Sequence, residues 1–253
     1  MIVSVSGAGG RMGSLVAETV AASADLELGP LYDPHHAGTK IAGHTVGDDP
    51  AAFADSDVVV EFTEPDVVME NLATWRSLGL SAVVGTSGFD AGRVAKLCEQ
   101  WGSGPPNCLV VPNFSIGAVV MMRLAELSAP HFAAAEIIEL HHDRKIDAPS
   151  GTAIATAERI AGAAPQNRAV ESNELLPGAR GADVLGVPVH AVRLPGLVAH
   201  QQVLFGGTGE TLTIRHDTTD RTAFMPGVVA AIRAVWDLDE PVTVGLGSIL
   251  GIE

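Results

Sequence analysis

The stretch Ile2-Val3-Ser4-Val5-Ser6-Gly7-Ala8-Gly9-Gly10-Arg11-Met12-Gly13 decides the fold of this chain. Its apolar start predicts a short strand, its glycines predict a tight turn, and residues 14–22 continue as a helix. This order is typical of a dinucleotide-binding turn, although the strict G-x-G-x-x-G spacing is not met because Met12 stands at its third glycine. The alternative is a tight strand-to-helix turn that binds nothing.

A second predicted strand, residues 26–32, ends in Asp33. An acidic residue at the end of the second strand is where such folds hydrogen-bond the ribose hydroxyls of an adenine dinucleotide. The other interpretation of Asp33 is a helix N-cap or a turn residue before Pro34. Asp33 therefore strengthens the dinucleotide interpretation of the glycine turn without deciding it.

Strands and helices continue to alternate through the first half of the chain. Strands are predicted at 57–62, 81–84 and 108–111, with helices from 66 to 78 and from 90 to 101. Alternation of this kind predicts a parallel, doubly wound sheet, whose ligands bind beyond the carboxyl ends of the strands. Besides the glycine turn and Asp33, these ends carry Phe62, Gly85, Thr86, Ser87, Pro112, Asn113 and Phe114.

The pattern changes after Ser115, where the strands no longer alternate regularly with helices. A mixed sheet is predicted, with a polar excursion within it. The elements are helices at 116–131 and 153–163, strands at 135–141, 187–193, 199–205 and 210–216, and the excursion at 167–186. We therefore expect an α/β chain with an N-terminal Rossmann-like, doubly wound parallel sheet, residues 1–113 completed by 220–253. A second α+β domain with a mixed sheet covers 114–219.

Composition excludes several classes of partner. The net charge of −15 disfavours nucleic acid and anionic membrane surfaces as partners. No basic region followed by a long apolar one opens the chain, so we expect a cytoplasmic protein without a signal peptide. Cys98 and Cys108 show no metal-ligand spacing, and we interpret them as buried thiols in a reducing compartment and predict no metal site.

A second stretch carries the chemistry: His141-His142-Asp143-Arg144-Lys145-Ile146-Asp147-Ala148-Pro149-Ser150-Gly151-Thr152. It connects a predicted strand to a predicted helix, where Ser150 suits an N-cap and Gly151 allows a ligand close to the backbone N–H groups. His141 can exchange a proton near neutral pH, and Lys145 is a compact donor to a carboxylate. The alternative is a solvated basic loop before a capped helix.

Five segments together resemble one enzyme family, the 4-hydroxy-tetrahydrodipicolinate (dihydrodipicolinate) reductases, and in particular its actinobacterial members. They are Gly7 to Gly13, Gly85 to Phe89, Pro112 to Gly117, His141 to Thr152, and Arg180-Gly181. The resemblance covers essentially the whole chain. It implies reduction of a cyclic dicarboxylate by a nicotinamide cofactor, with loss of water, in lysine and diaminopimelate synthesis.

The resemblance also implies roles for individual residues and a homotetramer built through the sheet of the second domain, which would thus serve both substrate binding and oligomerisation. His141 would be the proton donor or acceptor and Lys145 the second catalytic group. Substrate would be bound by His142, Gly151 and Thr152, with Ser150 at the same helix start. Cofactor contacts would come from Gly7, Ala8, Gly9, Gly10, Arg11, Met12, Asp33, Phe62, Gly85, Thr86, Ser87, Val111, Pro112, Asn113 and Phe114, with Arg221 and Phe224 as additions.

For the cofactor, we expect both NADH and NADPH to be used, with NADH favoured. Asp33 would accept from both ribose hydroxyls of NADH and repel the extra phosphate of NADPH. The next residues, Pro34, His35 and His36, include no permanent cation, so Arg11 is the remaining one for that phosphate.

Two other functions compete with a reductase of this kind. One is a different two-domain nicotinamide oxidoreductase, which would be expected to carry a nucleophilic cysteine near the cofactor or a differently spaced lysine. The other is a nucleotide-sensing regulator, which would need His141 or Lys145 to be missing, and both are present.

Overall fold

The computed structural model describes residues 1–164, 168 and 170–252, and the chain folds as two compact units. Unit 1 comprises Met1–Ser115 and Phe224–Gly251, and unit 2 comprises Ile116–Ala223 with Ile252. Each unit has its own sheet and its own apolar core, and each is described separately below.

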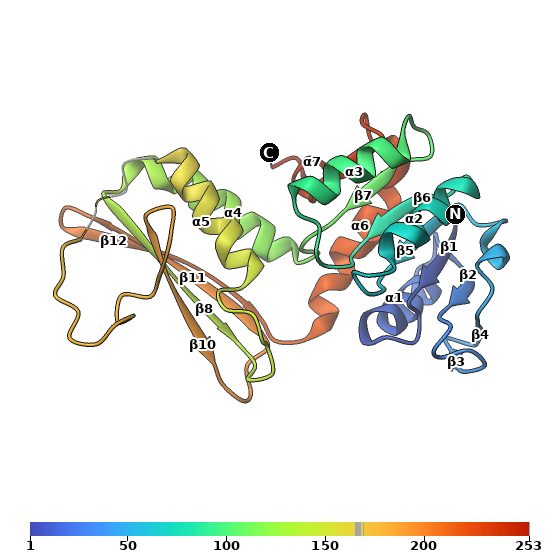
Figure 1. Cartoon of the computed structure of the whole chain (residues 1–253), viewed down its shortest axis with the longest axis horizontal. Helices are drawn as coiled ribbons and strands as arrows, with labels where there is room; N and C mark the ends of the chain where they lie inside the picture. The colour runs from blue at the N-terminus through green and yellow to red at the C-terminus, as the bar shows by residue number, and fades with distance from the viewer. Residues whose placement is uncertain (165–167, 169, 253) are drawn as a thin grey trace. The chain divides into compact units, whose positions relative to one another are not determined.

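Unit 1 is built on an eight-stranded sheet with the order β13-β7-β6-β5-β1-β2-β4-β3 (Figure 1). Its described strand pairs are parallel except β3 with β4. The order reverses at β1, which lies between β2 and β5, so the sheet has a topological switch point where ligands bind in such folds. The strands are β1 (Ile2–Ser6), β2 (Glu27–Tyr32), β3 (Lys40–Ile41), β4 (His44–Gly47), β5 (Val58–Glu61), β6 (Ser81–Val84), β7 (Cys108–Val110) and β13 (Val242–Val244).

The helices of unit 1 complete a core of aliphatic side chains and a few aromatic ones. Trp75 and Trp101 come from two of these helices and are buried against the strands, and Phe53 stacks on Trp75 with ring centroids 4.8 Å apart. Strand β5 is buried along its whole length, as a central parallel strand must be. The helices are α1 (Arg11–Ala22), α2 (Val68–Ser77), α3 (Ala91–Trp101), α6 (Met225–Ala234) and α7 (Gly247–Leu250).

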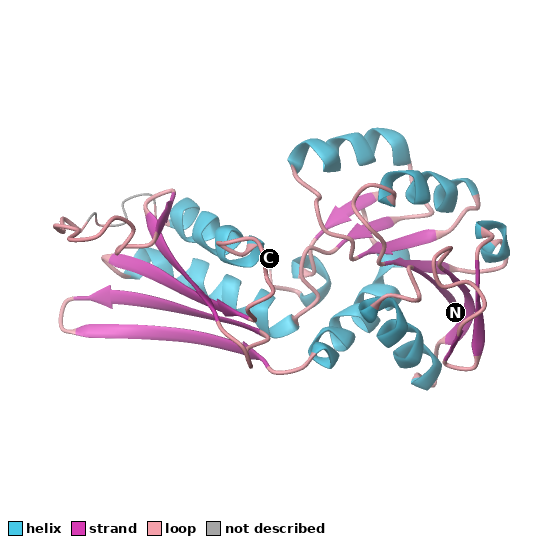
Figure 2. Cartoon of the chain, turned by 60° about the horizontal axis from the view of Figure 1, so that its bottom comes forward, coloured by secondary structure: helices cyan, strands magenta, loops and turns pink. Residues whose placement is uncertain are grey.

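Unit 2 is a five-stranded mixed sheet with the order β12-β11-β8-β10-β9. Helices α4 (Ile116–Ser128) and α5 (Gly151–Ala163) lie on the same side of this sheet (Figure 2). Along β8, Ala135, Ile137 and Glu139 are buried while their neighbours are partly exposed, which is the alternation of a strand with one covered face. The strands are β8 (Ala134–His141), β9 (Ala182–Val184), β10 (Val187–Arg193), β11 (Ala199–Gly207) and β12 (Glu210–Thr218).

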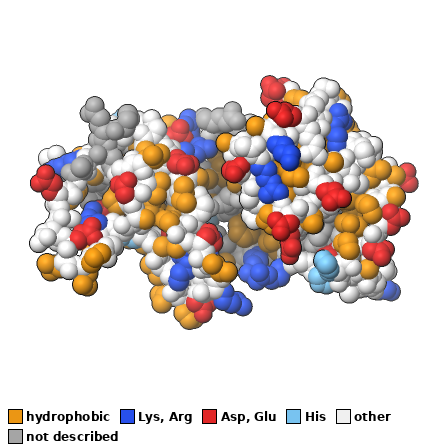
Figure 3. All heavy atoms as spheres, viewed as in Figure 1, with side chains coloured by type: hydrophobic (Ala, Val, Ile, Leu, Met, Phe, Trp, Pro, Cys, Tyr) orange, Lys and Arg blue, Asp and Glu red, His pale blue; other side chains and the backbone are white. Residues whose placement is uncertain are grey.

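The predicted fold class is confirmed, and the differences from prediction are local. The polar segment before residue 55 forms the short strands β3 and β4 and a 3-10 helix at Pro50–Phe53, which the sequence pattern does not predict. The prediction of two buried thiols is wrong for Cys98, which is exposed on α3, whereas Cys108 is buried. None of the described helices is long and apolar enough to cross a membrane. On the face seen in Figure 3, acidic, basic and apolar side chains are interspersed.

Candidate functional site

The glycine turn between β1 and α1 is held by close backbone approaches. Gly7 has φ +76°, and a Cβ atom there would lie 2.4 Å from the carbonyl oxygen of Phe62. A Cβ at Gly13 would lie 2.1 Å from the carbonyl oxygen of Gly7, so Gly13, one residue after Met12, lets the helix pack on the turn. Helix α1 begins after Gly10 without a side-chain cap, which leaves its first N–H groups for a ligand such as a pyrophosphate.

Asp33 lies beside this turn and accepts three hydrogen bonds. One carboxylate oxygen accepts from the Gly9 N–H at 3.0 Å and contacts Nδ1 of His36 at 2.9 Å, and the other accepts from the His35 N–H at 3.0 Å. The His36 ring lies so close to Gly9 that a Cβ on Gly9 would be 2.2 Å from its Cγ atom. Asp33 thus connects the second strand to the glycine turn, and His36 covers that connection.

A cavity of about 470 Å³ opens beside this cluster within unit 1. Its described lining contains three carboxylates, Asp33, Glu64 and Glu70, and neither a lysine nor an arginine. It also includes Gly7, Gly10, Tyr32, Phe62 and Thr63. A dinucleotide fits these features: the glycine turn offers N–H groups to a pyrophosphate and Asp33 offers a carboxylate to a ribose.

The ends of β5 and β6 are tied together by a buried polar cluster. The Thr86 hydroxyl accepts from the Thr63 N–H at 3.0 Å, and Glu61, which is fully buried, accepts from Nε1 of Trp75 at 2.7 Å. The rings of Phe62 and Phe114 pack with centroids 5.5 Å apart, and a Cβ on Gly85 would lie 2.2 Å from the Phe62 ring. These contacts explain why a glycine stands at the end of β6.

The remaining predicted cofactor residues occupy different places. Ser87 and Pro112 are exposed, while Val111 is buried after β7. Arg11 is exposed as the first residue of α1 and does not line the cavity. Arg221 belongs to unit 2 and Phe224 to unit 1, so the short 3-10 helix that contains both spans the boundary between the units.

In unit 2, His141 at the end of β8 contacts a buried carboxylate. Nδ1 of His141 lies 2.5 Å from Oε2 of Glu139, whose side chain has no exposed surface. The two Nη atoms of Arg193 each donate to one oxygen of Glu139 at 2.8 Å. Burial by itself would raise the pKa of Glu139, but the hydrogen bonds from His141 and Arg193 outweigh it and hold the pKa at about 2.

The start of α5 is fastened to the same carboxylate. The Ser150 N–H donates to Oε1 of Glu139 at 3.0 Å, and the Ser150 hydroxyl accepts from the Ala153 N–H at 3.2 Å, which makes Ser150 the N-cap predicted from the sequence. Apart from its chain neighbours and the backbone of its own helix, no described atom lies within 4 Å of a Cβ built on Gly151, so the side-chain position of that residue is open. The start of α5 can therefore receive an anion through its backbone N–H groups.

The loop between β8 and α5 carries the remaining charged groups. Nζ of Lys145 contacts both carboxylate oxygens of Asp147, at 2.8 and 2.7 Å. The pKa of His142 is lowered by desolvation and then by the positive charges of Arg144, His141 and Arg221. A neutral His142 can donate one N–H to a ligand but adds no charge. The permanent cations of this loop are Arg144, which is exposed, and the half-buried Lys145, which can meet an anion in exchange for Asp147.

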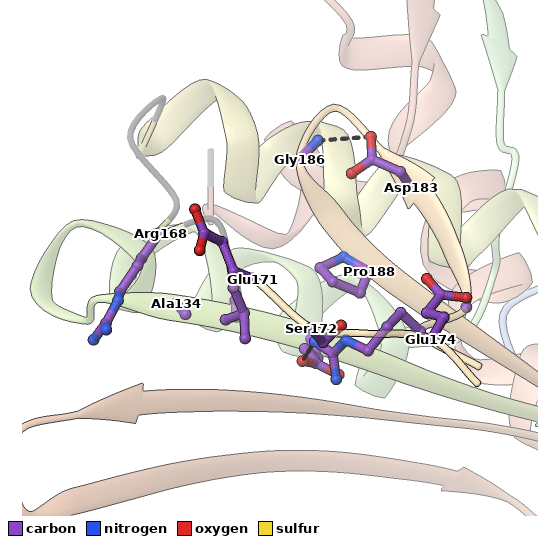
Figure 4. Close-up of a pocket in the computed structure, with 13 residues that line it drawn as sticks. Ala134, Arg168, Glu171, Ser172, Glu174, Asp183, Gly186 and Pro188 are labelled. Atoms are coloured by element: carbon purple, nitrogen blue, oxygen red, sulfur yellow. Dashed lines mark hydrogen bonds and ion pairs between the residues drawn. The ribbon is translucent and has the colours of Figure 1, made fainter. Parts of the chain in front are cut away.

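A second cavity, of about 510 Å³, lies elsewhere in unit 2 (Figure 4). Its described lining contains four carboxylates (Glu136, Glu171, Glu174, Asp183) against two guanidinium groups (Arg168, Arg180). One of these carboxylates, Asp183, accepts the Gly186 N–H at 3.1 Å, the bond drawn in Figure 4. An excess of negative charge makes this cavity unsuited to a dicarboxylate. Among the described residues, no group of three or more His, Cys, Asp or Glu side chains is gathered as for a metal ion.

Sequence reasoning missed Glu139 and Arg193. Glu139 is two residues before His141, and a signal for it exists: its position in the alternation places it on the same buried face as Ala135 and Ile137. A glutamate at a core position needs a partner. Arg193 offers no such signal, since it comes from another strand 54 residues away.

The arrangement defines a class of protein. A glycine turn opening a doubly wound sheet, together with a unit that presents a histidine, a lysine and a capped helix start, is the equipment of a two-unit, dinucleotide-dependent oxidoreductase.

Comparison with known proteins identifies the family within this class. The family model described as "Dihydrodipicolinate reductase, N-terminus" matches residues 1–114, and the one described as "Dihydrodipicolinate reductase, C-terminus" matches residues 117–250. The chain belongs to the dihydrodipicolinate reductase family, whose members use NAD(P)H.

Individual relatives agree with this assignment. The chain is 49% identical over 257 residues to the 4-hydroxy-tetrahydrodipicolinate reductase of Cutibacterium acnes (strain DSM 16379 / KPA171202), covering 99% of both chains. It is 48% identical over 259 residues to that of Mycobacterium marinum (strain ATCC BAA-535 / M), covering 100% of both. Among solved structures, the dipicolinate-bound dihydrodipicolinate reductase from Paenisporosarcina sp. TG-14 matches with a TM-score of 0.85 and 37% identity, over 98% of this chain and 99% of that one.

Proposed function

We propose that this chain catalyses the NAD(P)H-dependent reduction of 4-hydroxy-tetrahydrodipicolinate to tetrahydrodipicolinate in lysine and diaminopimelate biosynthesis, in the cytoplasm. The observation that carries the proposal is the 12-residue stretch His141 to Thr152 of unit 2, in which a histidine on a buried carboxylate, a lysine and a capped helix start follow one another. A family relationship over the whole chain supports the same activity.

The substrate is a dianion, so its site needs two places for a carboxylate. The helix start at Ser150, Gly151 and Thr152 can take one carboxylate through backbone N–H groups and the helix dipole. Lys145, with the N–H of a neutral His142, can take the other. The relative from Paenisporosarcina sp. TG-14, which has the same fold, binds dipicolinate, a planar ligand with two carboxylates.

His141 is assigned the proton transfer. The reaction takes up a hydride and a proton and releases water, so a proton donor is needed beside the reacting ring. When bound, the reduced nicotinamide supplies the hydride. His141 is suited to the proton because Glu139 occupies its Nδ1 and leaves Nε2 for exchange.

The cofactor is assigned to unit 1. The glycine turn from Gly7 to Met12 would bind the pyrophosphate, and Asp33 the adenosine ribose, where a ribose hydroxyl would compete with His36 for the carboxylate. Because the described lining of the cavity holds three carboxylates and no permanent cation, we propose that NADH is favoured over NADPH although both are used.

We also propose a homotetramer built through the sheet of unit 2. Helices α4 and α5 cover one face of that sheet, while the other face carries apolar side chains of alternate positions, among them Ile138, Leu140, Val192 and Leu204. A second copy of the chain would cover this face. Light scattering at micromolar concentration should give four times the mass of the chain, and the mass of a single chain would contradict the proposal.

A coupled assay tests the activity directly. The upstream synthase generates the unstable substrate, and loss of reduced-nicotinamide absorbance should depend on both that synthase and this chain. Binding of cofactor and dipicolinate without turnover would instead support the nucleotide-sensing alternative. Turnover of another substrate, such as an amino acid or a semialdehyde, without turnover of this one would support a different oxidoreductase.

A further inference from the structure

The Glu139 carboxylate meets more hydrogen-bond donors than a buried glutamate in a protein core requires. Its Oε2 faces Nδ1 of His141 at 2.5 Å and Nη1 of Arg193 at 2.8 Å. Its Oε1 faces Nη2 of Arg193 at 2.8 Å and the N–H of Ser150 at 3.0 Å. Two oxygens thus meet four donors from three different elements: the end of β8, the end of β10 and the start of α5.

The carboxylate cannot turn away from this arrangement. Arg193 binds it with both Nη atoms and also donates to the carbonyl oxygen of Asp147 at 2.6 Å, so the guanidinium is itself fixed between the strand and the loop. A bidentate pair of this kind fixes direction as well as distance. Because the Glu139 side chain has no exposed surface, water cannot replace any of the four donors.

This geometry decides which nitrogen of His141 carries a proton. Glu139, bound by both Nη atoms of Arg193, is ionised and can only accept, so Nδ1 of His141 must be the donor to Oε2. The neutral imidazole then has its proton on Nδ1 and a lone pair on Nε2. When His141 is protonated, the same carboxylate faces the imidazolium and stabilises its charge.

We propose, resting on the function assigned above, that Glu139 is the positioning residue for His141, with Arg193 holding the carboxylate in place. Glu139 fixes the tautomer and the orientation of the proton-donating ring. Because it also accepts from the Ser150 N–H, Glu139 fixes the position of the His141 ring relative to the start of α5, which receives the substrate carboxylate.

Replacing Glu139 by Gln tests this directly, because a glutamine of the same shape cannot satisfy four donors. Its amide NH₂ must face either the pair His141 and Arg193 or the pair Arg193 and Ser150. The second case sets the amide against two groups that can only donate, whereas in the first case His141 can shift its proton to Nε2 and accept from the amide. The first arrangement is therefore the expected one. We expect kcat to fall by at least about tenfold, with little change in KM for NADH.

The pH dependence of kcat is a further measurement, which a purely structural role of Glu139 would leave unchanged. Besides Glu139, charged and titratable groups come from several elements near His141. They are Arg193 from β10, His200 next to its partner Ala199 on β11, Arg221, and, in the loop, His142, Asp143, Arg144, Lys145 and Asp147. Only Glu139 is changed in the variant. The pH dependence of kcat should therefore differ between Glu139→Gln and the parent, because the buried carboxylate beside Nδ1 of His141 has lost its charge.

A double-mutant cycle shows whether Glu139 acts through His141. If it does, Glu139→Gln should lower kcat by no more than about twofold in a His141→Gln background. The matched control is Glu126→Gln on α4, which removes a carboxylate that also contacts arginines, Arg123 and Arg159, away from the sheet face assigned to the tetramer. It should leave kcat and the pH profile unchanged.

Two further measurements test the role of Glu139 without relying on the kinetics of Glu139→Gln. If Glu139→Gln does not fold, Arg193→Lys keeps the buried charge but loses the bidentate contact, and its loss of kcat should likewise vanish in the His141→Gln background. Nitrogen-15 NMR of His141 needs no turnover: we expect Nδ1–H in the parent protein and a loss of that tautomer in Glu139→Gln.

The inference is overturned if Glu139→Gln keeps the parental kcat and pH profile, if the cycle is additive, or if the parent carries its proton on Nε2. Failure of the proposed function is a separate result, since the parent would then show no reduction in the coupled assay while the NMR result would still decide the role of Glu139.

Discussion

Strand β8 carries two glutamates three residues apart, and each forms a cluster with one arginine and one histidine on opposite faces of the same sheet. Glu139 contacts Arg193 and His141, and Glu136 contacts Arg180 and His190. The chemistry of the two clusters is the same, but their burial differs: the side chain of Glu139 is 0% exposed and that of Glu136 is 30% exposed.

Burial changes what the same three residue types can do. Around Glu139, the histidine is at the end of the strand and leads into the loop before α5, whereas around Glu136 the histidine is inside β10 and faces another strand. Hydrogen bonds from His190 and Arg180 outweigh burial and lower the pKa of Glu136, but water also reaches this carboxylate. We propose that the same three residue types serve proton transfer in one place and form a partly exposed ion cluster in the other.

Replacing each of the two histidines by glutamine should change kcat to very different extents. His141→Gln should lower kcat by on the order of 10²-fold or more, with a smaller change in KM, because it removes the general acid. The counterpart His190→Gln should leave kcat within about twofold when light scattering shows the parental mass, since His190 lies on the opposite face of the sheet from His141. Steady-state kinetics in the coupled assay measures both, and equal losses in the two variants would erase the distinction between the clusters.

Lys145 is linked to the Glu139 cluster through Asp147, whose carboxylate contacts Lys145 and whose carbonyl oxygen accepts from Arg193. Lys145→Ala should raise KM, lower kcat, and weaken dipicolinate binding by about tenfold or more, the cost of losing one charged hydrogen bond. Calorimetric titration with dipicolinate measures the binding. Lys96→Ala, on an exposed position of α3, is the matched control. Unchanged dipicolinate affinity in Lys145→Ala would mean that the substrate site is elsewhere.

The two carboxylates should also differ in acid stability. The pKa of Glu139 is about 2 in the folded protein against an ordinary value of 4.5, so its contribution is complete above pH 4.5 and is lost as the pH falls toward 2. A shift of this size corresponds to roughly 3 kcal/mol. Urea denaturation midpoints should therefore drop between pH 4.5 and pH 2 in the parent and drop less in Glu139→Gln. A Glu136→Gln variant that flattened the curve more would reverse the comparison.

Much of this arrangement can be predicted from the sequence, because the signals are local. Strands β1 and β6 have the predicted bounds, since short apolar runs next to a glycine turn leave few alternatives. The place of Ser150 before an apolar helix predicts an N-cap, and Ser150 is one. The candidate site residues from His141 to Thr152 likewise come from one continuous stretch.

What could not be predicted depends on contacts between distant strands. Arg193 reaches Glu139 because β10 pairs in parallel with β8, and the sequence specifies neither that pairing nor its register. His36 has the sequence context of a loop residue after Asp33, and only the fold reveals that its ring lies against Gly9. The roles of the catalytic and cofactor residues therefore remain predictions until the variants are measured.

The smallest expected effect concerns a third carboxylate–imidazole pair, Asp33 with His36 in unit 1, where the histidine side chain is 49% exposed. The described lining of its cavity holds three carboxylates and no permanent cation, so at neutral pH it should disfavour the extra phosphate of NADPH. At an exposed site such repulsion is worth roughly 1 kcal/mol, or about fivefold in kcat/KM. The histidines His35 and His36 are the groups of this lining that can become cationic, so the preference for NADH should shrink at low pH. Comparing kcat/KM for the two cofactors at neutral and low pH measures the effect, and in His36→Gln the ratio should depend less on pH. A strong preference for NADPH at neutral pH would mean that Asp33 does not face the ribose.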